Sequence, residues 1–473
     1  MLRIGRMTIG SIEEWEPSLG SVISWQPTPA AREKARQAPV SSVPVSYMQA
    51  QHLRGYHEQT AMGLDYSRLL IFTCDMPGHC DIRAMNYVLN AHLRRHDTYR
   101  SWFEFTDAGD IIRHTIGDPA DIEFVPVRRG KISLQDLHKQ IVDTPNPLQW
   151  DCFTIGIIQS ENHFTFYASI DHVHVDATLV GVTLMEFYLM YTALAVGDAP
   201  LALPPAGSYD DYCVRQRQYT SALTLDSPQV RSWIDFAEKN NGSFPDFPLP
   251  LGDPSEPTGS GIVTEMLMDA EQTVRFESAC VEAGARFIGG VFACTALAEH
   301  ELTGAVSYCG LTPSDTRRTP ADLVTQGWFT GLVPITIPIA AASFGDAARS
   351  AQISFDSGLD LANVPYQRVL ELAPWLSGPR PNFPVLNFLD AGAAPLSALL
   401  TAELDDAKNI SLYGDGRYSY QLSIYVFRDE KGTAMAVMFP DNPIARKSVA
   451  SYITAMRSVC ARVADRGHWQ RVA

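Results

Sequence analysis

Residues 172–176 hold two histidines and one aspartate, side chains that can transfer protons or bind metal ions. They stand at alternate positions as His172, His174 and Asp176. A neutral imidazole with a pKa near ~6.5 suits the removal of a proton from a hydroxyl group that attacks a thioester, an effect typically worth ~10²–10⁴ in rate. Read as a His-x-x-x-Asp pair, the segment predicts that His172 is a general base and that Asp176 is a charged residue with a structural role.

Two other interpretations of the same residues stay open at this point. Asp176 would act as the N-cap of the following helix, with both histidines as ordinary core or surface residues. Alternatively, the alternating side chains offer three metal ligands on one face of a strand. Such a site needs further ligands and supporting hydrogen bonds, and no His-rich or Cys-rich segment stands out elsewhere in the chain. We therefore expect no metal site.

The hydrophobic pattern predicts the elements that position these residues. Residues 163–170 alternate between apolar and polar side chains, as in a half-buried β-strand, and the same period puts His172 on the apolar face. From Leu179 to Gly197 the chain is almost continuously apolar. This run approaches transmembrane length, but Glu186, two threonines and its direct connection to the strand favour a buried helix. The pattern predicts a strand that carries His172 into the interior, followed by a core helix.

The rest of the chain repeats this alternation of strands and helices. Residues 1–45 look irregular, apart from one or two helical turns at 30–37. After them come predicted helices at 46–53, 81–96 and 134–142 and strands at 67–74, 111–115, 122–127 and 147–158. The second half has predicted strands at 263–268 and 306–312, and a turn that leads into a strand within 327–337. A hairpin of 418–428 with 433–439 and helices at 270–285, 287–302 and 443–463 are also predicted. We predict an α+β protein with two similarly folded halves, 1–200 and 262–473, joined by a linker and interdomain helix at 201–261.

The composition limits the partners and the compartment. The formal net charge of −16 and the pI near 5.2 argue against nucleic acid or an anionic membrane surface as a general partner. An anionic cosubstrate would need a cluster of basic residues at the entrance of its binding site. The candidates are Arg94–Arg95, Arg128–Lys131 and Arg317–Arg318. Eight cysteines without a Cys-x-x-Cys motif fit a reducing cytoplasm, and the N-terminus lacks a secretory apolar region.

Five segments, taken together, resemble the motifs of one superfamily. They are Ser46–Leu53 (Ser-x-x-Gln), Arg95–Phe103 (arginine-histidine-x-x-hydrophobic-arginine), Asp171–Ala177 (HHxxxDG), Tyr209–Gln216 (Tyr-x-Asp-Tyr) and Gly327–Pro334 (Gly-x-Phe-x-Asn). In this order they are similar to the CoA-dependent acyltransferases and the condensation domains of nonribosomal peptide synthesis. Within that group the chain looks most like the mycobacterial polyketide-associated acyltransferases that esterify trehalose glycolipids.

The resemblance implies a fold and roles for particular residues. It implies two chloramphenicol-acetyltransferase-like halves arranged as a V, with donor and acceptor meeting in a central tunnel at His172. It implies that Asp176 points away from His172 and pairs with an arginine, for which we expect Arg317, across the halves. Trp328 and Thr330, in the Gly-x-Phe-x-Asn segment, are candidates for positioning the substrates. Two positions depart from the family pattern, because Asp171 replaces the first histidine of HHxxxDG and Ala177 replaces its glycine.

The function implied by the resemblance is transfer of a long-chain fatty acyl group to a hydroxyl of trehalose, in the synthesis of cell-envelope glycolipids. The donor would be palmitoyl-CoA or an acyl group bound to a polyketide synthase; acyl-CoA is then a cosubstrate, and no cofactor is expected. We expect a cytoplasmic monomer that does not bind nucleic acid, with peripheral contact at the inner face of the plasma membrane left open. A stand-alone amide-forming condensation enzyme, a non-catalytic relative that binds acyl carriers or lipids, and a metal hydrolase are the alternatives.

Overall fold

The structure is a computed structural model that describes residues 2–4, 7–64, 66–254, 256, 258–339, 343–380, 383–392, 407–415 and 422–467. Contacts group the chain into two compact units, each built from several stretches of sequence. Unit 1 comprises Met1–Tyr219, Arg317–Phe329 and Leu399–Gly416, and unit 2 comprises the rest. The domain ranges predicted from the order of the chain, 1–200, 201–261 and 262–473, are a different kind of division and stay a prediction.

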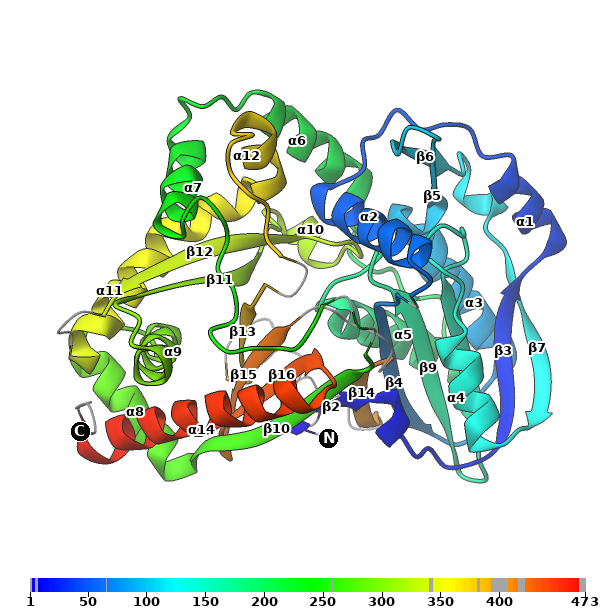
Figure 1. Ribbon diagram of the computed structural model, residues 1–473. Coiled ribbons are helices and arrows are strands. Elements are labelled where there is room, and N and C mark those ends of the chain that lie inside the picture. The colour runs from blue at the N-terminus through cyan, green and yellow to red at the C-terminus, as the bar shows by residue number, and fades with distance from the viewer. Residues whose placement is uncertain are drawn as a thin grey trace. The chain divides into compact units, whose positions relative to one another are not determined.

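Unit 1 is built on an eight-stranded sheet of order β1-β2-β14-β4-β9-β8-β3-β7 (Figure 1). In that order the strands are Leu2–Ile4, Met7–Ser11, Lys408–Gly414, Leu69–Pro77, His163–Asp171, Phe153–Gln159, Ser21–Pro27 and Phe124–Lys131. Its helices are α1 (Pro29–Arg36), α2 (Tyr47–Ala61), α3 (Ile82–Arg95), α4 (Leu134–Val142), α5 (Leu179–Ala195), α6 (Tyr209–Ser221) and α10 (Pro320–Leu323). A separate two-stranded ribbon pairs β5 (Ser101–Phe105) with β6 (Ile111–Thr115).

Strand β9 lies inside this sheet, antiparallel to β4 on one side and β8 on the other. Helix α5 covers one face of β9, where Phe187 packs on Phe166 with ring centroids 4.6 Å apart. Helix α4 covers the other face, where its apolar side chains join the core around Tyr167. The prediction of a half-buried strand was therefore wrong: β9 is buried on both faces, because its polar-looking face packs under α4.

The N-terminal segment and β14 complete the sheet in a way that the hydrophobic pattern did not indicate. Residues 1–45 were predicted to be irregular apart from one or two helical turns at 30–37. Helix α1 agrees with those turns, but the prediction missed β2 and β3, which belong to the sheet. Strand β14 comes from far along the chain and pairs parallel with β2 and antiparallel with β4. Short strands of this kind obtain their stability from their neighbours in the sheet, so their own sequence carries little signal.

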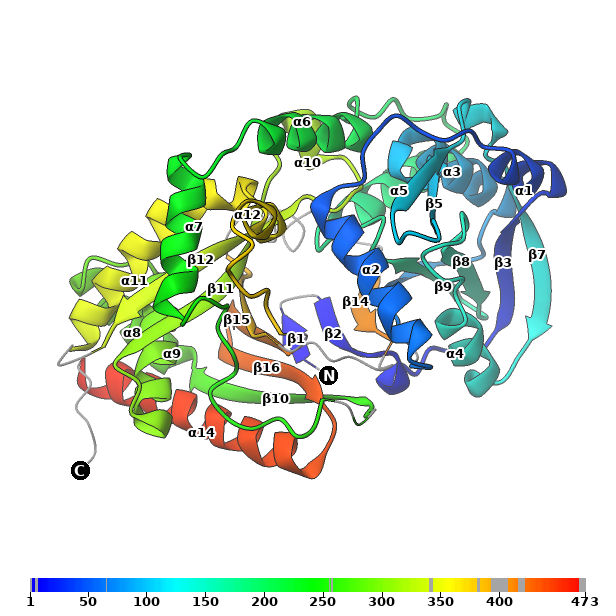
Figure 2. The same cartoon turned by 45° about the horizontal axis from the view of Figure 1, so that its top comes forward.

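Unit 2 is built on a six-stranded sheet of order β10-β16-β15-β13-β11-β12. In that order the strands are Ser260–Asp269, Gly432–Pro440, Ser423–Asp429, Val385–Asp390, Ser307–Asp315 and Thr330–Pro338. The helices are α7 (Pro228–Lys239), α8 (Ala270–Glu282), α9 (Phe287–Thr303), α11 (Phe344–Gly358), α12 (Tyr366–Leu372) and α14 (Pro443–Arg466). The apolar helix α9, seen in Figure 2, contacts both α11 and α14. Its buried side chains belong to a large core cluster of this unit.

Several predicted elements of unit 2 agree with the structure. Helices α8, α9 and α14 lie where the periodicity predicted them, and the predicted hairpin is β15 paired antiparallel with β16. The predicted start of this hairpin, from 418 to 421, lies outside the described residues.

In the part of the chain that is described, no single helix is both long enough and apolar enough to cross a membrane. Helices α8 and α9 pass that test of length and composition only as a pair, which is bent by 95°.

Candidate active site

His172 follows β9 directly and lies in a tight turn rather than on the strand itself. Its backbone N–H donates to the carbonyl of Arg68, the residue before β4, at 2.9 Å. The turn then closes on itself, since the His174 N–H donates to the Asp171 carbonyl at 3.1 Å. Sheet pairing thus continues past the end of β9 and fixes the backbone of His172 from both sides.

The imidazole of His172 stacks on the indole of Trp328, with ring centroids 3.9 Å apart and an angle of 30° between the planes. The side chain is partly exposed, but its Nδ1 atom is buried and has no hydrogen-bond partner in the described part of the chain. The stacking on Trp328 therefore fixes the plane of the ring. The burial of Nδ1 leaves Nε2 as the candidate atom for contact with a substrate.

The environment of His172 keeps its ring neutral. Burial lowers the pKa of His172 to about 3, and the neighbouring Arg68 and His52 act in the same direction. A neutral imidazole has a free lone pair, which a general base requires. The structure thus provides a base whose unprotonated form persists well below neutral pH.

Asp176 pairs with Arg317 and does not contact His172. Arg317 donates to the two carboxylate oxygens at 2.8 and 3.2 Å, and the side chains are only 1% and 4% exposed for Arg317 and Asp176. The same carboxylate accepts the backbone N–H and hydroxyl of Thr178 and the N–H of Phe329. The pairing implied by the family resemblance is present. We had expected it to join the two halves, but Arg317 is grouped with Asp176 in unit 1.

The N-cap interpretation of Asp176 does not describe its main contacts. The residue at the N-cap of α5 is Thr178, which makes no capping hydrogen bond with its side chain. Asp176 accepts the N–H and the hydroxyl of Thr178 within the turn, and its other side-chain hydrogen bonds reach residues 317 and 329. Its role is to tie the segment 317–329 to the turn that carries His172.

Trp328 is placed by close packing against helix α6. The Tyr209 hydroxyl donates to the Trp328 carbonyl at 3.3 Å and lies 2.9 Å from the Ser46 hydroxyl. Gly327 has a φ of 155°, and a Cβ atom at this position would lie 2.2 Å from Cδ2 of Tyr209. Glycine is therefore required here by the close approach of the Tyr209 ring.

The first motif segment reaches the same turn. Ser46 caps helix α2, and Gln49 completes that capping box while its Nε2 donates to the Val173 carbonyl at 2.9 Å. Both side chains are buried. The Ser-x-x-Gln segment thus supports the residue next to His172, and Ser46 connects it to Tyr209.

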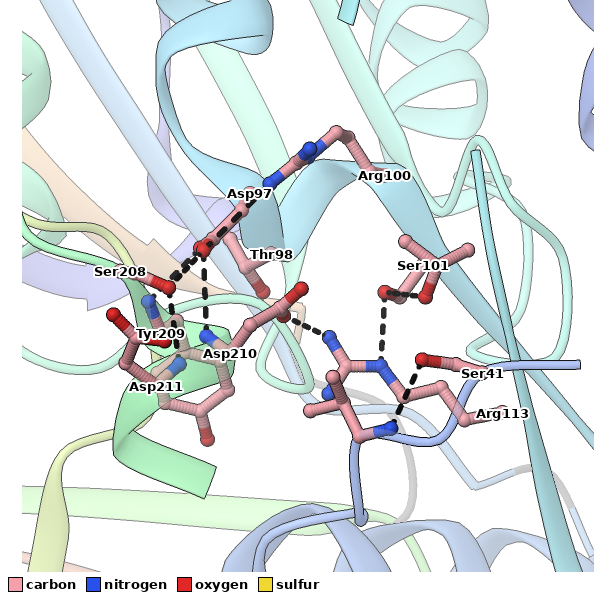
Figure 3. A network of polar contacts seen from close by, with 12 residues as sticks. Ser41, Asp97, Thr98, Arg100, Ser101, Arg113, Ser208, Tyr209, Asp210 and Asp211 are labelled. Atoms are coloured by element: carbon pink, nitrogen blue, oxygen red, sulfur yellow. Dashed lines mark hydrogen bonds and ion pairs between the residues drawn. The ribbon is translucent and has the colours of Figure 1, made fainter. Parts of the chain in front are cut away.

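Figure 3 shows the contacts that hold the beginning of α6. Asp97 accepts hydrogen bonds from the Ser208 hydroxyl at 2.6 Å and the Tyr209 N–H at 2.9 Å. Beside it, the buried Arg113 pairs with Asp210 and donates to the Ser101 hydroxyl. A carboxylate at a helix N-terminus is favourable, because unpaired amides and the helix dipole meet there. This network fixes α6 and, through Tyr209, the backbone at Trp328.

Asp171, which replaces the first histidine of the family motif, is paired with His52. The Nε2 atom of His52 lies 2.8 Å from the Asp171 carboxylate, which also accepts the Val173 N–H at 2.8 Å. Burial raises the pKa of Asp171, but the contacts with His52, the Val173 N–H and His174 together outweigh it, so that the pKa is lowered overall. The departure from the family pattern is therefore accommodated inside the fold, where Asp171 still braces the turn.

Glu186 is the centre of a buried group that resembles a metal site in composition. The possible ligand atoms of His92, His96 and Glu186 lie within 4.8 Å of one another. However, Arg95 also donates to Glu186 at 2.7 Å, and the Gln326 N–H donates to Nδ1 of His96, which leaves the proton of a neutral ring on Nε2. These contacts indicate a hydrogen-bonded group in which the carboxylate is already balanced by a guanidinium.

Most of the basic pairs predicted at the entrance for an anionic cosubstrate have other partners. Arg95 and Arg317 are bound to buried carboxylates, and Nε of Arg94 donates to the Ile122 carbonyl at 2.8 Å. Arg128 and Lys131 are exposed at the edge strand β7. Thr330 opens β12 in unit 2, so its proposed role in positioning a substrate stays a prediction.

A family model places this arrangement among known proteins. Residues 43–381 match the condensation-domain family, "Condensation domain", and this range includes all five motif segments. The chain therefore belongs to the condensation-domain family. The α+β class and the chloramphenicol-acetyltransferase-like fold predicted above are thereby confirmed, whereas the V with a central tunnel stays a prediction.

Individual relatives match along the entire chain. Acyltransferase PapA3 of Mycobacterium tuberculosis (strain ATCC 25618 / H37Rv) is 67% identical over 473 residues, covering 100% of both chains. Trehalose-2-sulfate acyltransferase PapA2 of Mycobacterium bovis (strain BCG / Pasteur 1173P2) is 58% identical over 461 residues, covering 97% of each. The solved structure "PapA2 acyl transferase" has a TM-score of 0.92 and 57% identity, and the match covers 97% of this chain and 100% of that one. The protein is an acyltransferase of this family, and the predicted resemblance is confirmed.

We predict that Asp176→Ala lowers the free energy of unfolding by about 3–5 kcal/mol, because it leaves the buried Arg317 guanidinium without its carboxylate. Arg317→Ala should cost a similar amount, and the double variant should cost less than the sum of the two. Chemical denaturation of the three variants measures this coupling. Arg318→Ala, at an exposed neighbouring side chain, is the control; equal and small effects at all positions would contradict the pairing.

We predict that stability decreases as the pH falls from about 6.5 toward 4. Burial lowers the pKa of His96 and of His174 to about 4, and that of His172 to about 3. Below pH 6.5 the unfolded chain binds protons that these folded rings reject, so each ring removes ~1.4 kcal/mol of stability per pH unit in that window.

Denaturation midpoints between pH 7.5 and 4.5 test this expectation. The slope of the free energy of unfolding against pH reports the number of protons taken up on unfolding. His174→Gln should lower this number by about one, whereas His79→Gln, at an exposed histidine, should leave it unchanged. A free energy of unfolding that does not change between pH 7 and 5 would mean that the buried rings are charged in the folded protein.

Proposed function

We propose that this acyltransferase transfers a long-chain fatty acyl group from a thioester to a hydroxyl of trehalose or of a trehalose derivative, in glycolipid synthesis. The observation that carries the proposal is the partly exposed, neutral His172 ring, which stacks on Trp328. Hydrogen bonds to Gln49, Arg68 and Arg317 brace the turn that carries it. The names of the relatives add the substrate class, since PapA2 is called a trehalose-2-sulfate acyltransferase.

In the proposed reaction His172 acts as a general base and then as a general acid. Its Nε2 removes the proton from the acceptor hydroxyl while that oxygen attacks the thioester carbonyl. The tetrahedral intermediate collapses with cleavage of the carbon–sulfur bond, and the leaving thiolate takes the proton back from His172. No acyl-enzyme is formed, and holding donor and acceptor beside one base supplies much of the rate.

Asp176 acts on this reaction only through position. Both its oxygens are bound to Arg317, Thr178 and the amide of Phe329, so none is available to the ring of His172. The carboxylate keeps the segment 317–329 against the turn, and that segment carries Trp328. Asp176 is therefore a positioning residue in the proposed mechanism.

We also propose a cytoplasmic location with peripheral contact at the inner face of the plasma membrane, and a monomeric state. All eight cysteines are free thiols, and six of them are buried, which supports a reducing compartment. The donor is proposed to be an acyl-CoA, with an acyl group on a polyketide synthase as the alternative.

Mass spectrometry of the products tests the function. With palmitoyl-CoA and trehalose or trehalose-2-sulfate, the parent protein should form an acylated sugar, and His172→Ala should reduce its formation by at least about 10²-fold without unfolding the protein. His79→Ala, at an exposed histidine, is the control. Full activity of His172→Ala would overturn the base assignment. Product formed only with an amine acceptor would favour an amide-forming enzyme.

The pH dependence of kcat/KM tests the state of His172 separately. Because the pKa of His172 is lowered to about 3, we expect kcat/KM not to fall as the pH decreases from 8 to 5. With an ordinary histidine base, kcat/KM would fall below a pH of ~6.5. Steady-state rates at several pH values, with the fold checked by circular dichroism at each, provide the measurement. A fall of kcat/KM centred near pH 6.5 would show that the ring of His172 is not held neutral.

A further inference from the structure

The outer side of helix α5 is apolar and reaches the solvent. Met185, Leu189, Thr192 and Val196 recur at the spacing of three or four residues that puts side chains on one side of a helix. Met185 and Val196 are 36% and 75% exposed, and the two residues between them are half-buried. Glu186, the one charged residue of the helix, is buried and binds Arg95. Only part of this apolar helix is therefore used by the core.

The loop that follows α5 continues the apolar surface. Residues 197–206 form no helix or strand, and Asp198 is their one charged residue. Leu201 is 44% exposed. Three more exposed residues of the loop are prolines, at positions 200, 204 and 205. An exposed loop of this composition is unusual, because loops in water normally carry polar side chains.

This loop is fixed to two neighbouring helices. Arg95, in the last turn of α3, donates to the Pro204 carbonyl, and the Gly207 N–H donates to the Ala321 carbonyl of α10 at 3.1 Å. Leu323 of the same short helix is 56% exposed. We call the whole set the α5 surface; it consists of Met185, Leu189, Thr192, Val196, residues 197–206 and Leu323.

The chemistry of the α5 surface fits a lipid bilayer better than a protein partner. A protein interface has a rim of polar and charged groups around its apolar centre, whereas the loop offers one carboxylate, Asp198. Prolines have no N–H, so three positions of the loop need no hydrogen-bond acceptor among lipid headgroups. Helix α5, with 17 residues, is about 25 Å long and suits a position along the bilayer surface.

The proposed reaction gives such a contact a use. A palmitoyl thioester and an acylated trehalose carry long alkyl chains, which favour a bilayer over water. Helix α5 begins at Leu179, three residues after Asp176 in the turn that carries His172. An enzyme held on a bilayer by the α5 surface would keep His172 close to the place where its substrates collect.

We propose that the α5 surface binds a lipid bilayer by inserting its apolar side chains between the headgroups. The use of this contact rests on the proposed function. The net charge of −16 repels an anionic bilayer, so the apolar contact supplies the binding. Salt screens that repulsion and should therefore strengthen the binding. A basic membrane-binding surface has the opposite dependence on salt.

Co-sedimentation of the full-length protein with vesicles tests the proposal. The vesicles contain phosphatidylcholine with about one-fifth phosphatidylglycerol, and we expect binding to increase between about 0.05 and 0.5 M NaCl. Val196→Asp and Leu201→Asp should each weaken the partition by about tenfold, because a charge replaces an apolar contact. Val306→Asp and Ile353→Asp are the matched controls, at side chains of unit 2 that are 64% and 69% exposed, and should bind as the parent protein does.

Four outcomes would overturn the proposal. Absence of co-sedimentation at every salt concentration would mean that the α5 surface does not bind lipid. Binding that decreases as salt is added would assign it to basic groups. An equal loss in Val306→Asp and Val196→Asp would mean that any added charge has the same effect. A parent protein that sediments as a dimer in solution, and as a monomer with Val196→Asp, would assign the surface to a second copy of the chain.

Acyl transfer without vesicles separates this proposal from the function on which it rests. Val196→Asp and Leu201→Asp should keep the parent rate with palmitoyl-CoA and trehalose in solution, because neither residue contacts His172. A loss of that rate would mean that these residues act on the fold, which contradicts the proposal. If the parent protein acylates neither sugar but binds vesicles through the α5 surface, the proposed function fails and the lipid contact stands.

Discussion

The ion pair between Asp176 and Arg317 holds together the parts of the molecule on which the site depends. Both charges are withdrawn from water, a state that is acceptable only because the carboxylate and the guanidinium satisfy each other and several backbone groups. Arg317 and Phe329 bound the segment that carries Trp328, and Asp176 bounds the turn that carries His172. One carboxylate therefore fixes the relation between the base and the ring on which it stacks.

The same principle recurs around the turn, where buried carboxylates join segments that are distant in sequence. Asp97 binds the beginning of α6, Glu186 gathers α3 and α5, and Asp171 binds His52 of α2. Charged hydrogen bonds are directional, unlike apolar contacts, so they specify one arrangement of the segments they join. The apolar core stabilises unit 1, whereas these polar contacts determine where the imidazole and the indole lie.

The electrostatics of the site favour an uncharged base. Burial, together with the neighbouring Arg68 and His52, keeps His172 neutral, which suits proton removal but makes the protonated ring costly. Such a site works best when negative charge develops or arrives next to the ring during the reaction.

Part of this description was available before the structure. The alternation of residues 163–170 indicated a strand that ends just before His172, and the apolar run after Asp176 indicated α5. The segments around Ser46, His96, Tyr209 and Trp328 were recognised as motifs, although no pattern in them shows that they meet. The hydrogen-bonded group around Glu186 was missed, because a single acid in an apolar helix gives no indication of its partners.

The amino-acid sequence by itself determined the family, the type of chemistry and the residues available for it, since these depend on side-chain identity and on order along the chain. Only the tertiary structure decided that β9 is buried on both faces, that Arg317 reaches Asp176 within one unit and that Asp171 is matched by His52. It also decided that the guanidinium of Arg68 lies over the ring of Trp328, close to the base. Burial, charge pairing and pKa depend on distances between residues far apart in sequence, and those distances exist only after the chain has folded.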